Sequence, residues 1–207
     1  MVDARLQHLL QGNPALWQAG KISRAGRRVV PSGFAALDAV LPGGGWPADA
    51  LLEIISPLRA IGELQLLLPA MVELTRRGNW LVWIAPPYLP YAPALVASGI
   101  ELKRVLVLPA ASVKDQADWA LEKILRSNAC GMALAWPSTL SPGRVRRLQL
   151  AAQEGGSLGV LFRDQDVSAS PAAMRLRLQA LADGLQVEIL KARGGAQCRV
   201  RVDLTQR

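Results

Sequence analysis

The sequence predicts an α/β domain built on a largely parallel β-sheet, and three observations carry that prediction. Short apolar runs alternate with helix-period segments over most of the chain, as in sheets that are covered by helices on both faces. After Pro171 the pattern changes to strict alternation of apolar and polar residues, which predicts half-exposed antiparallel strands. The 207 residues are 51% hydrophobic and 19% charged, so the chain has enough apolar surface to fold on its own.

Residues 1–30 are predicted to form an arm that precedes a core domain of residues 31–207. Apolar side chains with helical spacing come first, and a basic stretch and the strand-like Val29-Val30 follow. The apolar positions are Leu6, Leu9, Leu10 and Trp17, and the basic ones include Arg27 and Arg28. A short helix gains little alone, so we expect the arm to dock on a neighbouring molecule or a second copy. The alternative is that it folds back on its own core.

The core begins with a capped helical turn over Pro31–Asp38 and a loop over Leu41–Pro47, where three glycines and two prolines oppose regular structure. Predicted strands and helices then alternate. The strands are 50–55, 80–85, 105–108, 131–136 and 158–162, and the helices are 63–77, 91–98, 113–127 and 141–154. Pro69 should kink the first of these helices or lie in its first turns.

The C-terminal segment carries three alternating stretches, at 174–178, 185–189 and 198–204. Gly194-Gly195 lies between the last two, so we predict a terminal antiparallel hairpin. A helix over 172–181 is the alternative for the first stretch.

The net charge of +8 is concentrated at the ends of the chain. Residues 1–30, 31–137 and 138–207 carry +4, −1 and +5. This distribution suggests basic surface for weak nucleic-acid binding or for an acidic partner, although an arginine-rich surface of a GC-rich genome gives the same pattern. The candidate basic residues are Arg144, Arg146, Arg147, Lys191, Arg193, Arg199 and Arg201.

Several function classes are disfavoured by composition. One histidine, His8, and two cysteines, Cys130 and Cys198, are too few for a zinc cluster or a histidine-based catalytic relay, so we expect no metal. No apolar run is long enough to span a bilayer and no signal-peptide pattern opens the chain, so we expect a cytoplasmic protein without membrane contact. Trp46 lies in the Gly-Pro loop, where it is a candidate exposed aromatic anchor for a protein partner; the alternative is ordinary packing in the core.

The segment from Pro31 to Pro47, followed by the Leu51–Ile54 strand, resembles the start of the RecA-like ATPase core. A phosphate loop of that fold needs G-x-x-x-x-G-K-[ST], because backbone amides and the lysine neutralise phosphate while the hydroxyl holds magnesium. The aligned positions here are Ser56, Gly62, Glu63 and Leu64. A carboxylate at the lysine position repels phosphate, so the loop is predicted to be degenerate.

Other parts of an ATPase are also missing. Pro87 stands where the resemblance implies a catalytic glutamate, and Trp136 stands where it implies a magnesium-binding aspartate. We therefore expect no ATP hydrolysis, no tight ATP binding and no other cofactor. The resemblance implies a RecA-like core kept as a non-catalytic scaffold.

Two bacterial DNA-damage families resemble the chain more closely. Residues 5–204 are similar to the ImuA family of translesion DNA synthesis, most specifically in Gly62–Pro69 and Gly184–Gly195. Residues 61–170 are similar to the SulA family of SOS cell division inhibitors, which bind FtsZ. Trp80–Pro87, Leu121–Asn128 and Gly159–Arg163 carry the second likeness.

From the ImuA resemblance we expect a non-enzymatic adaptor of the damage-induced mutagenic polymerase complex. Its implied partners are an inactive Y-family polymerase homologue of the ImuB type, an error-prone DnaE-type polymerase, and RecA. The alternative is a SulA-like inhibitor that binds FtsZ. An ATP-driven recombinase is disfavoured because the ATPase motifs are lost.

Overall fold

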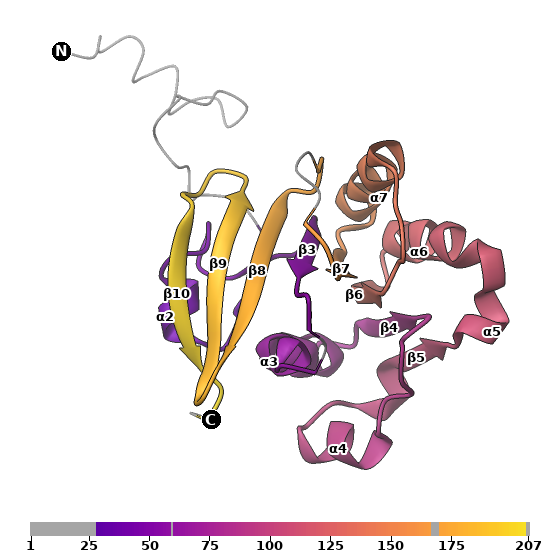
Figure 1. Cartoon of the computed structure of the whole chain (residues 1–207). Coiled ribbons are helices and arrows are strands. Elements are labelled where there is room, and N and C mark those ends of the chain that lie inside the picture. The colour runs from indigo at the N-terminus through magenta and orange to yellow at the C-terminus, as the bar shows by residue number, and fades with distance from the viewer. Residues whose placement is uncertain (1–27, 59, 167–169, 206–207) are drawn as a thin grey trace, which may run out of the picture.

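The computed structural model of the chain describes residues 28–58, 60–166 and 170–205, and these form a mixed α/β fold (Figure 1). An eight-stranded sheet has the order β10-β9-β8-β3-β7-β6-β4-β5. Its strands are β3 (Leu51–Ile55), β4 (Trp80–Ile84), β5 (Val105–Leu108), β6 (Cys130–Ala135), β7 (Leu158–Arg163), β8 (Met174–Leu181), β9 (Gly184–Ala192) and β10 (Cys198–Asp203).

The sheet has a parallel part and an antiparallel part. The pairs from β8 through β3, β7, β6 and β4 to β5 are all parallel, whereas β8, β9 and β10 pair antiparallel. This confirms the predicted largely parallel sheet and the C-terminal hairpin. The alternating stretch at 174–178 is strand β8, so the alternative helix over 172–181 is wrong.

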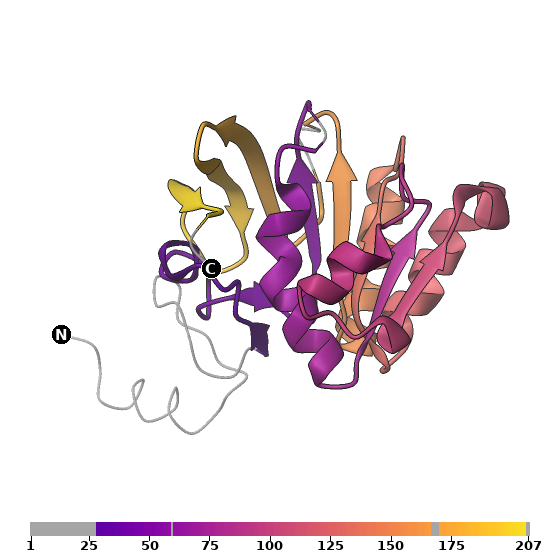
Figure 2. The same cartoon turned by 90° about the horizontal axis from the view of Figure 1, so that it is seen from below.

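Helices cover both faces of the sheet. They are α2 (Ala35–Asp38), α3 (Glu63–Arg76), α4 (Ala92–Ala97), α5 (Ala110–Val113), α6 (Ala117–Arg126) and α7 (Pro142–Gly155), with short 3₁₀ turns η1 (Leu102–Arg104) and η2 (Lys114–Gln116). Helices α3 and α4 lie on one face, in front of the strands in Figure 2, and α6 and α7 lie on the other. The parallel strands are therefore enclosed between two layers.

Strand β3 shows how the two layers form separate cores. Successive side chains of a strand point to opposite faces. Leu52 and Ile54 join the apolar cluster under α3, which includes Leu66. Leu51 joins the cluster under α6 and α7, which includes Leu125. Because both faces are covered, all five residues of this central strand are buried.

Two local predictions need correction. The predicted helix 113–127 is divided into α5, η2 and α6. The predicted loop over Leu41–Pro47 contains a two-residue strand, β2 (Trp46–Pro47), which pairs with β1 (Val29–Val30). Pro69 lies in the second turn of α3, in agreement with its predicted place in the first turns, and the helix continues to Arg76. Gly33 lies so close to the Pro69 ring that a Cβ there would stand 2.4 Å from the proline Cβ, so this contact requires glycine.

Candidate functional site

A groove lined by aromatic and apolar residues lies at the carboxyl ends of β4 and β6, where open parallel sheets place their ligand sites. We call it the aromatic groove, and its cavity has a volume of about 410 Å³. It is formed by Ala60 and Gly62–Gln65, Trp83, Pro86–Tyr91, Ala94, Leu95 and Trp136. The loop before α3, the segment after β4 and helix α4 therefore meet at this site.

The segment after β4 is shaped by its prolines. Ala85 adopts a left-handed backbone conformation with φ of 47°, and Pro86-Pro87 cannot continue the ladder because proline has no N–H to donate. The chain leaves the sheet here and re-enters regular structure at α4, which has a proline in its first turn. The residues between β4 and α4 are consequently presented at the edge of the sheet.

This segment exposes large apolar side chains next to one another in the sequence. Tyr88, Leu89 and Tyr91 are 76%, 74% and 72% exposed. Exposed clusters of this kind on the rim of a groove are typical of protein-binding surfaces, where tyrosine supplies contact area at a small entropic cost.

The floor of the groove is a packed aromatic cluster. The rings of Trp83 and Trp136 lie 5.8 Å apart, and Trp136 stacks on Phe162 at 4.7 Å. Trp83 is only 4% exposed, and its indole Nε1 has no hydrogen-bond partner. The floor is thus held by ring packing and gives the exposed rim a firm support.

The opposite wall is the loop that was predicted to be a degenerate phosphate loop. Ser56 is buried at the end of β3, and Gly62 has a left-handed φ of 110° just before α3. The Glu63 carboxylate accepts hydrogen bonds from the backbone amides of Ala60, at 3.0 Å, and Ile61, at 2.9 Å. Two amides of this loop are therefore already occupied by a carboxylate of the chain itself, while Leu64 lines the groove and packs against the apolar core under α3.

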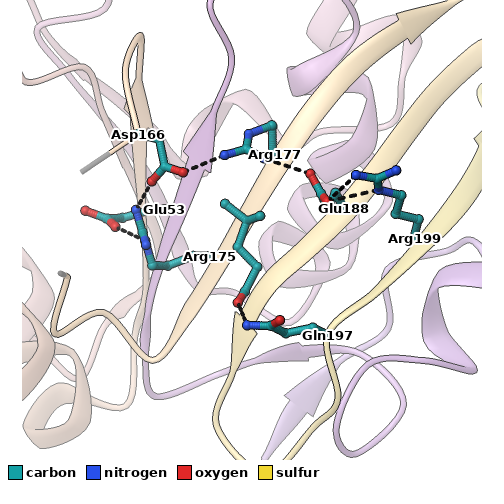
Figure 3. A network of polar contacts seen from close by, with 8 residues as sticks. Glu53, Asp166, Arg175, Arg177, Glu188, Gln197 and Arg199 are labelled. Carbon is teal, nitrogen blue, oxygen red and sulfur yellow. Dashed lines mark hydrogen bonds and ion pairs between the residues drawn. The ribbon is translucent and has the colours of Figure 1, made fainter. Parts of the chain in front are cut away.

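The predicted basic surface of the C-terminal hairpin is largely neutralised. Figure 3 shows a chain of ion pairs that runs across the sheet from Glu53 to Arg199 with alternating charges. Its members are Glu53, Arg175, Asp166, Arg177, Glu188 and Arg199. Arg201 pairs with Asp183. Hydrogen bonds from Arg199 hold the pKa of Glu188 below its usual value, and Arg201 does the same for the pKa of Asp183.

The arginines of α7 differ among themselves. Arg147 pairs with Glu122, a buried carboxylate of α6 that also pairs with Arg126. Burial of Glu122 works to raise its pKa, but the hydrogen bonds from the two arginines outweigh burial and lower it. Arg144 and Arg146 are exposed. The structure therefore does not gather the three arginines into one unpaired cluster.

The remaining predicted residues are dispersed. Lys191 donates to the carbonyl of Ser170, and Arg193 lines a small cavity beside Gln149. Leu6, Leu9, Leu10, Trp17 and Arg27 lie outside the described residues, and Arg28, the first described residue, is exposed. The predicted role of the arm stays a prediction.

Trp46 is fully buried, so the prediction of an exposed anchor there is wrong. Its strand β2 pairs with β1, and Gly45 packs so tightly that a Cβ would lie 2.5 Å from the carbonyl oxygen of Val30. The exposed aromatics are instead Tyr88 and Tyr91. A signal for them existed in the sequence, because a tyrosine- and proline-rich stretch directly follows a buried strand.

Comparisons with known proteins connect the part of the chain that carries this groove to one class of protein, the inhibitors of bacterial cell division. A family model described as "Cell division inhibitor SulA" matches residues 58–159. These residues are therefore similar to the SulA family.

Three individual relatives are also named cell division inhibitor SulA. The chain is 32% identical over 117 residues to cell division inhibitor SulA of Photorhabdus laumondii, covering 56% of this chain and 66% of that protein. It is 33% identical over 111 residues to SulA of Edwardsiella piscicida, covering 53% and 66%. It is 28% identical over 117 residues to SulA of Serratia marcescens, covering 56% and 69%. The chain thus spans slightly less than two thirds of the first two relatives.

These findings correct the predicted function. The family model and the relatives name a cell division inhibitor, so the prediction of a translesion-synthesis adaptor is wrong. The predicted partners, an ImuB-type Y-family homologue and a DnaE-type polymerase, are contradicted by the same matches. The SulA-like alternative agrees with them.

Two further results concern only residues 28–58, 60–166 and 170–205. No helix in these ranges combines the length and the apolar character needed to cross a membrane. Nor do these residues bring together three His, Cys, Asp or Glu side chains in an arrangement that could hold a metal ion.

Proposed function

We propose that this protein inhibits cell division by binding FtsZ through the aromatic groove, without catalysing a reaction. The observation that carries the proposal is the exposure of Tyr88, Leu89 and Tyr91 at the rim of a firm aromatic floor. All of these rim residues fall inside the segment 58–159 that matches the SulA family. A site that binds a protein by burying aromatic anchors needs this combination of exposed side chains and rigid support.

We also propose that the core is a RecA-like scaffold whose phosphate loop has become a wall of the docking site. Strand β3, the loop after it and helix α3 form a strand–loop–helix unit in which Glu63 binds the amides of Ala60 and Ile61. A carboxylate in this place repels phosphate. It also occupies the two backbone N–H groups, which are then not free to donate to a phosphate. The loop then shapes the groove instead of binding a nucleotide.

The proposal is tested by producing the protein in growing bacterial cells and measuring cell length. The wild-type chain is expected to cause filamentation, and binding of the purified protein to FtsZ should be measurable by surface plasmon resonance. Replacement of one rim side chain, Leu89→Ala or Tyr91→Ala, should weaken binding about 10-fold or more, as expected for central interface residues.

Leu150→Ala is the matched control. Leu150 is 52% exposed but lies on α7, away from the groove, so its loss should leave both binding and filamentation unchanged. Normal cell length with the wild-type chain, together with no binding to FtsZ, would show that the proposed function is wrong.

A further inference from the structure

A second cavity lies at the carboxyl ends of β6 and β7. It has a volume of about 430 Å³ and is lined by Pro137–Leu140 and Arg163–Gln165. Both hollows lie at the carboxyl end of the sheet, but on opposite faces. Trp136 and Phe162 belong to the apolar cluster under α3, whereas Arg163, the next residue of β7, points to the face covered by α6 and α7. We call the second hollow the arginine cavity, after Arg163 in its lining.

Arg163 is the last residue of β7 and is held firmly in place. Its backbone carbonyl accepts a hydrogen bond from the amide of Ser56 at 2.9 Å, and its side chain is partly buried. The guanidinium Nη1 is shielded from solvent and has no hydrogen-bond partner. Among the residues that the structure describes, no carboxylate forms an ion pair with it.

This lack of an acceptor distinguishes Arg163 from the two ion-paired arginines of β8. The most deeply buried described arginine, Arg175, has its Nε 2.9 Å from Glu53 and also pairs with Asp166. Arg177 bridges Asp166 and Glu188. A buried cationic donor without an acceptor is costly, and proteins normally supply one. Among the described residues, nothing supplies this acceptor to the Arg163 Nη1, so the partly exposed guanidinium can take one from another molecule.

The other groups in the cavity indicate the chemistry of that molecule. Ser138 and Thr139 contribute exposed hydroxyls and Gln165 an amide, all of which donate to oxyanions. Asp164 also lines the cavity and adds one negative charge. A single guanidinium beside an aspartate suits a singly charged carboxylate, which matches the guanidinium fork, better than a phosphate dianion.

We propose that Arg163 binds an aspartate or glutamate side chain of the protein that docks in the aromatic groove. This inference rests on the proposed function, because it requires a partner that reaches from the aromatic groove over the carboxyl edge of the sheet to the arginine cavity. Apolar contacts in the groove would supply affinity, and the ion pair would fix the register of the partner along the sheet edge. Removing one member of such a pair leaves the other without a partner in a partly desolvated site.

The test is binding of purified FtsZ to the full-length wild-type chain and to Arg163→Gln. Arg146→Gln is the matched control, because it removes the same charge from an exposed residue of α7. The control should bind like the wild type, whereas Arg163→Gln should bind about 10- to 100-fold more weakly. Arg163→Lys, which keeps the charge but loses the fork, should fall between them.

The outcomes separate the two claims. If the wild type and Arg146→Gln bind FtsZ but Arg163→Gln binds equally well, the inference is overturned and the proposed function stands. If the wild type does not bind FtsZ, both fail. Thermal unfolding checks the fold of each variant, and if Arg163→Gln is unfolded the comparison of Arg163→Lys with Arg146→Gln decides in the same way.

Titration of the wild-type chain with inorganic phosphate distinguishes a free anion from a partner side chain. The proposal is supported if phosphate binds so weakly that millimolar concentrations do not saturate the protein. Phosphate binding at micromolar concentration that is lost in Arg163→Gln, with FtsZ binding unchanged, would overturn it and make the cavity a small-anion site.

Discussion

Replacing Arg175 by methionine should destabilise the protein strongly, because Arg175 neutralises a carboxylate at the centre of the sheet. Glu53 on β3 and Arg175 on β8 are register partners, and their side chains are 3% and 8% exposed. Arg175→Met leaves the Glu53 carboxylate buried without its cation. Breaking a buried pair in this way costs about 3–5 kcal/mol.

The double variant Glu53→Leu/Arg175→Met removes both charges and fills the same space with apolar groups. Buried ion pairs replaced in this way are often neutral in stability. Asp166 loses one partner in either variant, but it is partly exposed and keeps Arg177, so this adds less than about 1 kcal/mol. We expect the double variant to recover most of the loss caused by Arg175→Met.

The free energy of unfolding is measured in urea by tryptophan fluorescence, which reports on the core through Trp83. Single and double variants are compared with the wild type at neutral pH. The reasoning is refuted if Arg175→Met costs less than about 1 kcal/mol, or if the double variant is as unstable as the single one.

Three further predictions follow from buried or paired groups. Burial raises the pKa of the Cys130 thiol to about 12. A thiol reagent at pH 7 should therefore modify Cys198 alone in the native protein and both cysteines in urea. Equal rates of modification of the two cysteines in the native protein would contradict this. Glu122→Gln should cost about 1–2 kcal/mol at pH 7. Because the folded-state pKa of Glu122 is lowered, its stabilising contribution is present above the ordinary value of 4.5 and is lost as the pH falls below it. If Glu122→Gln costs the same stability at pH 3 as at pH 7, this prediction is wrong. Glu63→Ala should speed amide hydrogen exchange of Ala60 and Ile61 about 10-fold, since both lose their acceptor, and unchanged exchange would show that the loop does not depend on Glu63.

The elements that sequence predicted well are those fixed by burial. Trp80–Ile84 is a continuous apolar run because both faces of its strand are covered, and such runs identify central parallel strands. The alternation in β9 and β10 likewise follows from one buried and one exposed face. The break at Lys114–Gln116 carries no comparable signal, because a 3₁₀ turn between two short helices is decided by local packing.

The site was harder to predict because it depends on distances between segments that are remote in sequence. Trp46 lies in a stretch with the composition of a loop, but its pairing with β1 turns it inward. Arg199 seemed a free cation, yet the register of β9 and β10 sets it opposite Glu188. The lack of an acceptor for the Arg163 Nη1 emerges only when the described neighbouring groups have been placed.

The effect of this protein on the polymerisation of purified FtsZ tests the central claim most directly. Light scattering should show that the wild-type chain and Leu150→Ala reduce the amount of polymer equally, whereas Leu89→Ala and Tyr91→Ala leave most of it intact. Undiminished polymer in the presence of excess wild-type protein, or equal inhibition by the rim variants and Leu150→Ala, would contradict the account that the aromatic groove is the site of inhibition.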